Sequence, residues 1–185
     1  MNLRIVIAVM CLTFAVSSAS AQDIYFTRTG RIDFHAGTTM EDIDATNNEV
    51  ASILDKAKGE IAFNVLIKSF HFRRTLMEEH FNENYLESSK YPKATFKGKI
   101  VNSDKINFNA NGTYTSHVEG DLTIHGVTKA VKAPATFIVE GKQIKGYASF
   151  SIKAQEFNIE IPGVVADKIS KQISINVQCI YEPRN

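Results

Sequence analysis

Five histidines are the side chains in this sequence best suited to acid–base chemistry or metal binding, and their spacing supports neither. They are His35, His71, His80, His117 and His125, and none forms a recognised ligand pattern such as HExxH. We interpret His35, His71 and His117 as strand or turn residues on polar faces, and His80 as a neighbour of an apolar helix stripe. A metal site is therefore not predicted.

Cysteine and carboxylate chemistry is not indicated either. Cys11 lies in a segment that we expect to be removed, which leaves Cys179 without an intrachain disulfide partner. Cys179 alternates with aliphatic residues, so we expect it to be a buried core residue and not a nucleophile. The acidic pairs Glu78–Glu79 and Asp42/Asp44 fit a solvated surface, and the sequence has no GxSxG motif and no Gly-rich phosphate loop. No enzyme activity and no cofactor are predicted.

The first 21 residues have the features of a secretory signal peptide. A short positive start, residues 1–4, precedes an apolar run of 12 residues, 5–16, and the small residues Ala19, Ser20 and Ala21 follow it. The apolar run is too short to span a bilayer, which takes roughly 20 residues. We therefore expect cleavage near Ala21, a mature chain of residues 22–185 without a transmembrane segment, and a periplasmic or secreted location.

The charge of the mature chain excludes bulk electrostatic binding. The sequence has 21 Lys and Arg against 20 Asp and Glu, and loss of Arg4 with the signal leaves 20 of each. A neutral chain lacks the basic surface that nucleic acid requires, so no nucleic-acid partner is predicted. A length of 185 residues with 44% hydrophobic residues suits one globular domain.

The elements that would position any site are mostly strands. Apolar and polar residues alternate from Ile173 to Tyr181, as expected for a strand buried on one side. Similar or shorter runs occur at 24–27, 31–36, 61–67, 96–100, 122–124, 135–139 and 148–152. Turn residues lie beside them at 29–30, 111–112, 125–126 and 140–142. The pattern predicts an all-β domain of about eight mostly antiparallel strands, closed or nearly closed into a barrel.

Two segments depart from the strand pattern. Residues 73–88 are charged, with Leu76, Met77, Phe81 and Tyr85 near helical spacing, and predict one amphipathic helix lying across the end or flank of the barrel. Residues 40–55 are acidic and rich in Asn and Thr, and we expect a loop with a short helical turn at 49–54.

The aromatic content indicates what the barrel holds. The sequence has 12 Phe, 6 Tyr and no Trp. A barrel of about eight strands holds either its own side chains or one small ligand, and both outcomes fit Phe-rich inner faces. For an unfilled interior, the favoured guest is a hydrocarbon chain, because burial of each methylene contributes about 0.8 kcal/mol.

Several motifs resemble the YceI-like family of secreted bacterial proteins. They are Tyr91–Phe96 (YPKATF) and Gly120–Lys129 (GDLTIHGVTK), with further similarity at 148–152, 157–159 and 169–177. The resemblance implies an extended lipocalin-like barrel around a long apolar pocket for a polyisoprenoid or related lipid. The N-terminal third, with the acidic segment Glu41–Asn48, departs from the family pattern. We interpret His125 as a turn residue of the hairpin after the GDLTI strand.

Alternation and resemblance together predict a lipid-binding barrel for a long apolar ligand such as a polyisoprenoid or a quinone. The predicted lining comprises Phe63, Phe96, Leu122, Phe137 and Phe150 from strands, and Leu76, Met77 and Phe81 from the helix. Two alternatives stay open: a solid-cored envelope interaction module without lipid, and an enzyme with His80 or His71 as base. A homodimer that buries the helix face or an edge strand is also open.

Overall fold

The structure, a computed structural model, describes residues 23–184. The predicted signal peptide lies outside the described residues. The strands are β1 (Ile24–His35), β2 (Asp44–Asp55), β3 (Glu60–Leu66), β4 (His71–Phe72), β5 (Lys93–Ile100), β6 (Gly112–Ile124), β7 (Val127–Glu140), β8 (Gln143–Ile152) and β9 (Ile173–Pro183). The helical elements are α1 (Thr75–His80), a π turn η3 (Phe81–Tyr85), and the 3-10 turns η2 (Ile67–Ser69), η4 (Ser103–Lys105), η5 (Ala154–Phe157) and η6 (Gly163–Val165).

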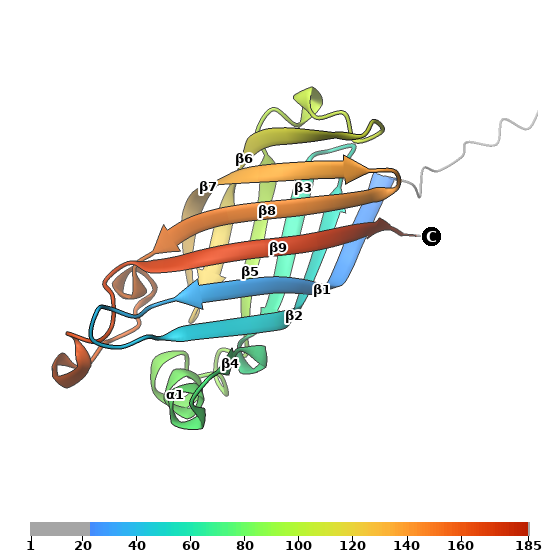
Figure 1. Ribbon diagram of the computed structural model, residues 1–185. Helices are drawn as coiled ribbons and strands as arrows, with labels where there is room; N and C mark the ends of the chain where they lie inside the picture. The colour runs from blue at the N-terminus through green and yellow to red at the C-terminus, as the bar shows by residue number, and fades with distance from the viewer. Residues whose placement is uncertain (1–22, 185) are drawn as a thin grey trace, which may run out of the picture.

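Eight of the strands close into an antiparallel barrel. The sheet order is β1-β9-β8-β7-β6-β5-β3-β2-β4, and an additional pairing of β1 with β2 joins the sheet to itself. The two-residue strand β4 is appended to the start of β2 and lies outside the closed ring. Closure leaves the eight main strands without a free edge, as the period-two pattern predicts. In Figure 1 the strands surround the interior, and α1 lies below β1 and β2.

The tight turns follow the predicted chemistry at two hairpins. His125 and Gly126 connect β6 to β7 with φ angles of 50° and 75°. A turn with two consecutive residues of positive φ matches the right-handed twist of the flanking strands. Gly126 suits the second position because glycine adopts a positive φ without steric cost. Gly141, with φ of 60°, begins the two-residue turn between β7 and β8.

The prediction of a turn at Thr29–Gly30 was wrong. Strand β1 continues through both residues, and its register with β2 shifts on either side of Gly30. A Cβ at Gly30 would lie 2.7 Å from the Cys179 sulfur and 3.1 Å from the Val50 carbonyl oxygen. Gly30 therefore marks a bulge where the strand comes close to its neighbours. The runs at 24–27 and 31–36 are two halves of one strand.

The prediction of a loop with a helical turn for residues 40–55 was also wrong, because β2 spans Asp44–Asp55. Two polar side chains on this strand are buried: Asn47 donates to the Leu66 carbonyl at 3.0 Å, and Ser52 donates to the Ala62 carbonyl at 2.9 Å. The buried residues also switch from odd positions, 45 and 47, to even positions, 50, 52 and 54. Polar burial and this phase change hide the alternation that identifies a strand.

The predicted amphipathic helix exists but is shorter than residues 73–88. Helix α1 and the π turn η3 together span residues 75–85. Arg74 is extended, with φ of −116°, and Glu87 has a positive φ of 42°, so the chain leaves the helical conformation on both sides. Among the described residues, no helix is long and apolar enough to cross a membrane.

The core consists of two clusters at opposite ends of the barrel. One includes Phe108, Phe137, Ile144 and Tyr181 and fills the end at which β1 begins and β9 ends. The Phe108 and Phe137 rings, 6.1 Å apart, show that the β5–β6 connection covers this end. The second cluster surrounds the opposite end, beneath the helix and the β8–β9 connection. The interior therefore has one filled end and one end that requires a separate cover.

Candidate functional site

A cavity of about 520 Å³ occupies the barrel interior between the filled end and the helix. Its lining is dominated by aliphatic and aromatic side chains from seven of the eight strands of the closed ring, all except β2, and from α1. The charged side chains of the lining, Glu41, Arg74 and Lys168, belong to connections at the helix end. The site is therefore an apolar cavity whose charged lining residues all lie at one opening, the mouth.

Strand alternation positions the lining side chains. On β9, the predicted inward residues at 173, 175, 177, 179 and 181 all line the cavity. Phe63 of β3 pairs with Phe96 of β5, and Phe96 pairs in turn with Leu122 of β6, so these three form a row across adjacent strands. Across the barrel, Phe150 of β8 pairs with Ile175 of β9.

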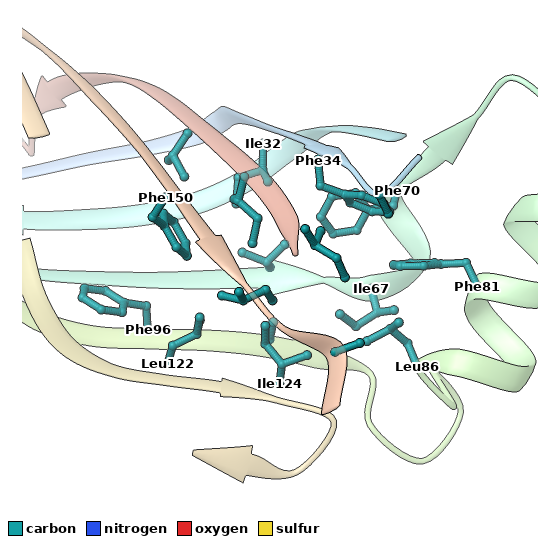
Figure 2. A pocket seen from close by; sticks show the side chains of 18 of the residues that line it. Ile32, Phe34, Ile67, Phe70, Phe81, Leu86, Phe96, Leu122, Ile124 and Phe150 are labelled. Carbon is teal, nitrogen blue, oxygen red and sulfur yellow. The ribbon is translucent and has the colours of Figure 1, made fainter. Parts of the chain in front are cut away.

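All eight residues of the predicted lining are located at the cavity wall: Phe63, Leu76, Met77, Phe81, Phe96, Leu122, Phe137 and Phe150. Figure 2 shows Phe96, Leu122 and Phe150 directed into a shared space, with Phe81 approaching from the helix. Their contact with a ligand stays a prediction.

An aromatic cluster that sequence reasoning missed joins the helix to the barrel. Phe81, the first residue of η3, has ring centroids 5.4 Å from Phe34, 5.7 Å from Phe70 and 5.1 Å from Phe72. Phe34 comes from the end of β1, while Phe70 and Phe72 lie in the segment before α1. Phe34 is far from residues 70–81 in the chain, so no local pattern predicts its contact with them. This cluster anchors the cover of the cavity (Figure 2).

The mouth is held by charge pairs centred on one carboxylate. Glu41, whose side chain is 17% exposed, accepts from Arg74 at 2.6 Å and lies 3.4 Å from the Lys168 nitrogen. Arg74 precedes α1, and Lys168 follows η6. A single side chain of the β1–β2 connection therefore links the helix to the β8–β9 connection.

The deep end of the cavity has polar atoms that are satisfied within the protein. The Tyr181 hydroxyl lies 2.8 Å from the Ser52 hydroxyl, which bonds the Ala62 carbonyl. Burial raises the pKa of the Cys179 thiol to about 11 and raises the pKa of Tyr181 well above its usual value. Cys179 is thus the buried core residue that alternation predicts, in its protonated form at neutral pH.

The histidines do not form a common site. In residues 23–184, no group of three His, Cys, Asp or Glu side chains is arranged to hold a metal ion. His35 pairs with Asp44 at 2.7 Å on the outer surface, and His71 lies 3.5 Å from Glu78 with 69% of its side chain exposed. His80 lines the cavity near the mouth.

His125 has the predicted turn conformation and a further contact that sequence reasoning missed. Its ring is 11% exposed, and Nε2 lies 2.6 Å from Oε2 of Glu87. Tyr91 packs edge-on against it, with ring centroids 4.6 Å apart. The hairpin β6–β7 is thereby joined to the segment that follows the helix.

Comparison with known proteins gives a consistent family match. A family model described as a YceI-like domain matches residues 13–180. A UPF0312 protein of Pseudomonas savastanoi pv. phaseolicola is 33% identical over 146 residues, which cover 74% of this chain and 70% of that protein. A UPF0312 protein of Pseudomonas putida (strain W619) is 36% identical over 98 residues, and this alignment spans about half of each chain (50% and 47%).

Solved structures show the same fold at low sequence identity. A polyisoprenoid-binding domain from Saccharophagus degradans, implicated in plant cell wall breakdown, superposes with a TM-score of 0.75 at 14% identity, covering 88% of this chain and 99% of that one. BcnA of Burkholderia cenocepacia gives a TM-score of 0.67 at 18% identity, covering 82% and 95%. A Campylobacter jejuni YCEI protein gives 0.64 at 18% identity, covering 80% and 89%.

Proposed function

This chain belongs to the YceI-like family, and from that membership we propose that it is an exported protein that holds one long apolar molecule, such as a polyisoprenoid or a quinone, inside its barrel. The observation that carries the proposal is the cavity of about 520 Å³ with an apolar wall and charges confined to the mouth. The polyisoprenoid-binding domain of Saccharophagus degradans, which has the same fold, supports the choice of ligand class.

The size of the cavity suits a single chain. At roughly 30 Å³ for each small group, the liquid volume of one water molecule, it accepts on the order of 17 carbon-sized groups. Burial of that many methylenes would contribute on the order of 10 kcal/mol before association costs are subtracted. The tail alone can therefore supply binding, and a polar head would remain near Glu41, Arg74 and Lys168 at the mouth.

We propose binding and not catalysis as the activity. The buried thiol of Cys179 has its pKa raised to about 11, which disfavours the thiolate that a nucleophile requires. His71 is absent from the cavity lining, and His80 lies on it beside the mouth. Turnover of an apolar substrate that is lost in a His80→Ala variant would support the enzyme alternative instead.

The experiment that tests the proposal is native mass spectrometry of the exported protein purified without detergent, followed by solvent extraction. We expect a stoichiometric apolar molecule, and an N-terminus at Gln22 after signal cleavage. A protein that is bare, and stays bare after incubation with polyprenyl phosphates, quinones and fatty acids, would favour the interaction module without lipid.

A matched pair of variants separates the cavity from the outer wall. Phe150→Glu places a charge on the cavity lining, whereas Phe26→Glu changes a residue of β1 that is absent from the lining. Because a buried charge without a partner is costly, Phe150→Glu should abolish folding or ligand uptake, while Phe26→Glu should retain both. Wild-type folding and uptake by Phe150→Glu would contradict an inward binding role.

A further inference from the structure

Three exposed apolar side chains stand around the mouth of the cavity on three different connections. Met40 is 69% exposed on the β1–β2 connection, Leu76 is 61% exposed on α1, and Val164 is 92% exposed on η6. Isolated exposed hydrophobic residues are common, but a group at one opening requires a reason. The other large hydrophobics exposed within residues 23–184 are Ile53, Leu66 and Ile180, which lie on barrel strands.

Specific contacts hold the three connections beside one another. Thr38 donates to the Asp167 carbonyl at 3.0 Å, so the β1–β2 connection lies against the residues that follow η6. Glu41, next to Met40, pairs with Arg74 at 2.6 Å and with Lys168 at 3.4 Å. The exposed tips therefore belong to one rim and not to unrelated surfaces.

The apolar surface of this rim continues into the cavity. Leu76 is both exposed and part of the cavity wall, and Val165, adjacent to Val164, also lines the cavity. Ile43, three residues after Met40, lines it as well. An apolar chain leaving the cavity would thus pass along hydrophobic side chains until it reaches the outside of the protein.

The charge of the rim points to a neutral partner. Segments 36–43, 73–80 and 160–172 contain four Lys and Arg and six Asp and Glu, so they have no cationic surplus. Glu41 is paired with both Arg74 and Lys168, so these two cations are partly compensated within the protein. This surface therefore does not attract anionic phosphates. It would bind a bilayer by inserting its apolar side chains.

We propose that this mouth docks on the zwitterionic surface of a lipid bilayer, with Met40, Leu76 and Val164 inserted among the lipids. The inference rests on the proposed function, because a long apolar ligand resides in hydrocarbon and would pass directly between the bilayer and the cavity. A fluid lipid surface accommodates tips on separate connections and leaves the opening between them in contact with hydrocarbon.

The test compares two double variants in flotation with phosphatidylcholine vesicles. Met40→Ser/Val164→Ser removes two rim tips that do not line the cavity, and Ile53→Ser/Ile180→Ser removes two exposed residues from the barrel wall. We expect the wild-type protein and the wall variant to float with the vesicles. The fraction of the rim variant that floats should be at least five-fold lower than that of the wild type. Adding phosphatidylglycerol to the vesicles should not increase binding.

Ligand loading, measured by native mass spectrometry, separates this inference from the proposed function. Both variants should load ligand to the wild-type level in detergent-free solution, while transfer of ligand between vesicles should slow at least five-fold in the rim variant only. Docking is overturned if a ligand-loaded wild-type protein does not float, or if both variants lose flotation equally. It is also overturned if size-exclusion chromatography shows that the rim holds a dimer that the rim variant loses. Absence of any loaded ligand, with flotation intact, would overturn the proposed function and leave the docking surface.

Discussion

His125 and Glu87 form a short contact that joins the turn of the β6–β7 hairpin to the segment after the helix, with 2.6 Å between Nε2 and Oε2. The other ring nitrogen lies 3.3 Å from the Phe157 carbonyl oxygen in η5. A carboxylate and a carbonyl both supply acceptor oxygens, so each ring nitrogen of His125 faces an acceptor. One turn residue thus connects three segments that flank the cavity.

Loss of this contact should destabilise the protein. In His125→Ala, Oε2 of Glu87 and the Phe157 carbonyl lose their contact with a ring that is 11% exposed, while Oε1 of Glu87 keeps Lys90 at 3.9 Å. Because hydrogen bonds to charged groups contribute about 1.5–3 kcal/mol and the Glu87 side chain is 43% exposed, we expect the free energy of unfolding in urea to fall by about 1–2 kcal/mol. The matched control is His35→Ala, whose pair with Asp44 has exposed fractions of 49% and 53% and should contribute less than about 1 kcal/mol. Equal losses in the two variants would contradict a structural role for His125.

Neutralising Glu41 should open the mouth. Glu41→Gln keeps the side-chain volume but leaves Arg74 and Lys168 as neighbouring cations without the carboxylate between them. We expect the dissociation rate of a bound apolar ligand to rise roughly 5- to 10-fold, equivalent to about 1 kcal/mol, with little change in global stability. Stopped-flow release of a fluorescent polyprenol analogue would measure this rate.

The control for Glu41 is an ion pair on the barrel wall. Glu119→Gln removes a carboxylate that lies 3.6 Å from Lys132, with both side chains more than half exposed. Its release rate should match the wild-type rate. An unchanged rate for Glu41→Gln would show that the charge pairs do not hold the mouth.

Much of the barrel could be predicted from sequence because most inward residues are apolar and alternate strictly. Strand β9 is the clearest example, and the His125–Gly126 turn was identified from its glycine. Strand β2 could not be predicted, because Asn47 and Ser52 occupy buried positions and a bulge changes the phase. The predicted number of eight nevertheless equals the number of strands in the closed ring, because β1 contains two apolar runs and β2 contains none that the alternation identifies.

The mouth could be predicted less well than the wall. Strand pairing and the amphipathic stripe place side chains such as Phe96 and Phe81 by local periodicity. The contacts of Phe34 with Phe70, and of Glu41 with Lys168, join residues far apart in the chain. Their proximity depends on closure of the barrel, which no local pattern encodes.

Filling the deep end of the cavity should select for shorter ligands. A Cβ at Gly146 would lie 3.3 Å from Tyr181 and 3.7 Å from Phe137, at the filled end. Gly146→Val suits a strand and places its branched methyl groups at this floor, so affinity for chains longer than about 15 carbons should fall about ten-fold, or about 1.4 kcal/mol, while short chains bind as before. Gly146→Ala is the control, since it adds the Cβ alone. A uniform loss across fatty acids of increasing length, measured by calorimetry, would indicate general disruption instead.

Cys179 should be unreactive in the folded protein and should make stability fall at high pH. Burial raises the pKa of the thiol from its ordinary value of 9.0 to about 11, so between these two pH values the unfolded chain binds fewer protons than the folded one. Stability should therefore be constant below about pH 9 with respect to this thiol and fall between pH 9 and 11, by ~3 kcal/mol at most. Native protein should resist iodoacetamide at pH 8 and react once it is unfolded in urea.

The control for the pH dependence is Cys179→Ala, because Tyr181 also has a raised pKa. The free energy of unfolding of this variant should fall less steeply above pH 9 than that of the wild type, and the remaining decrease would come from other groups such as Tyr181. Alkylation of the native protein at the rate of a free thiol would contradict the buried, protonated state.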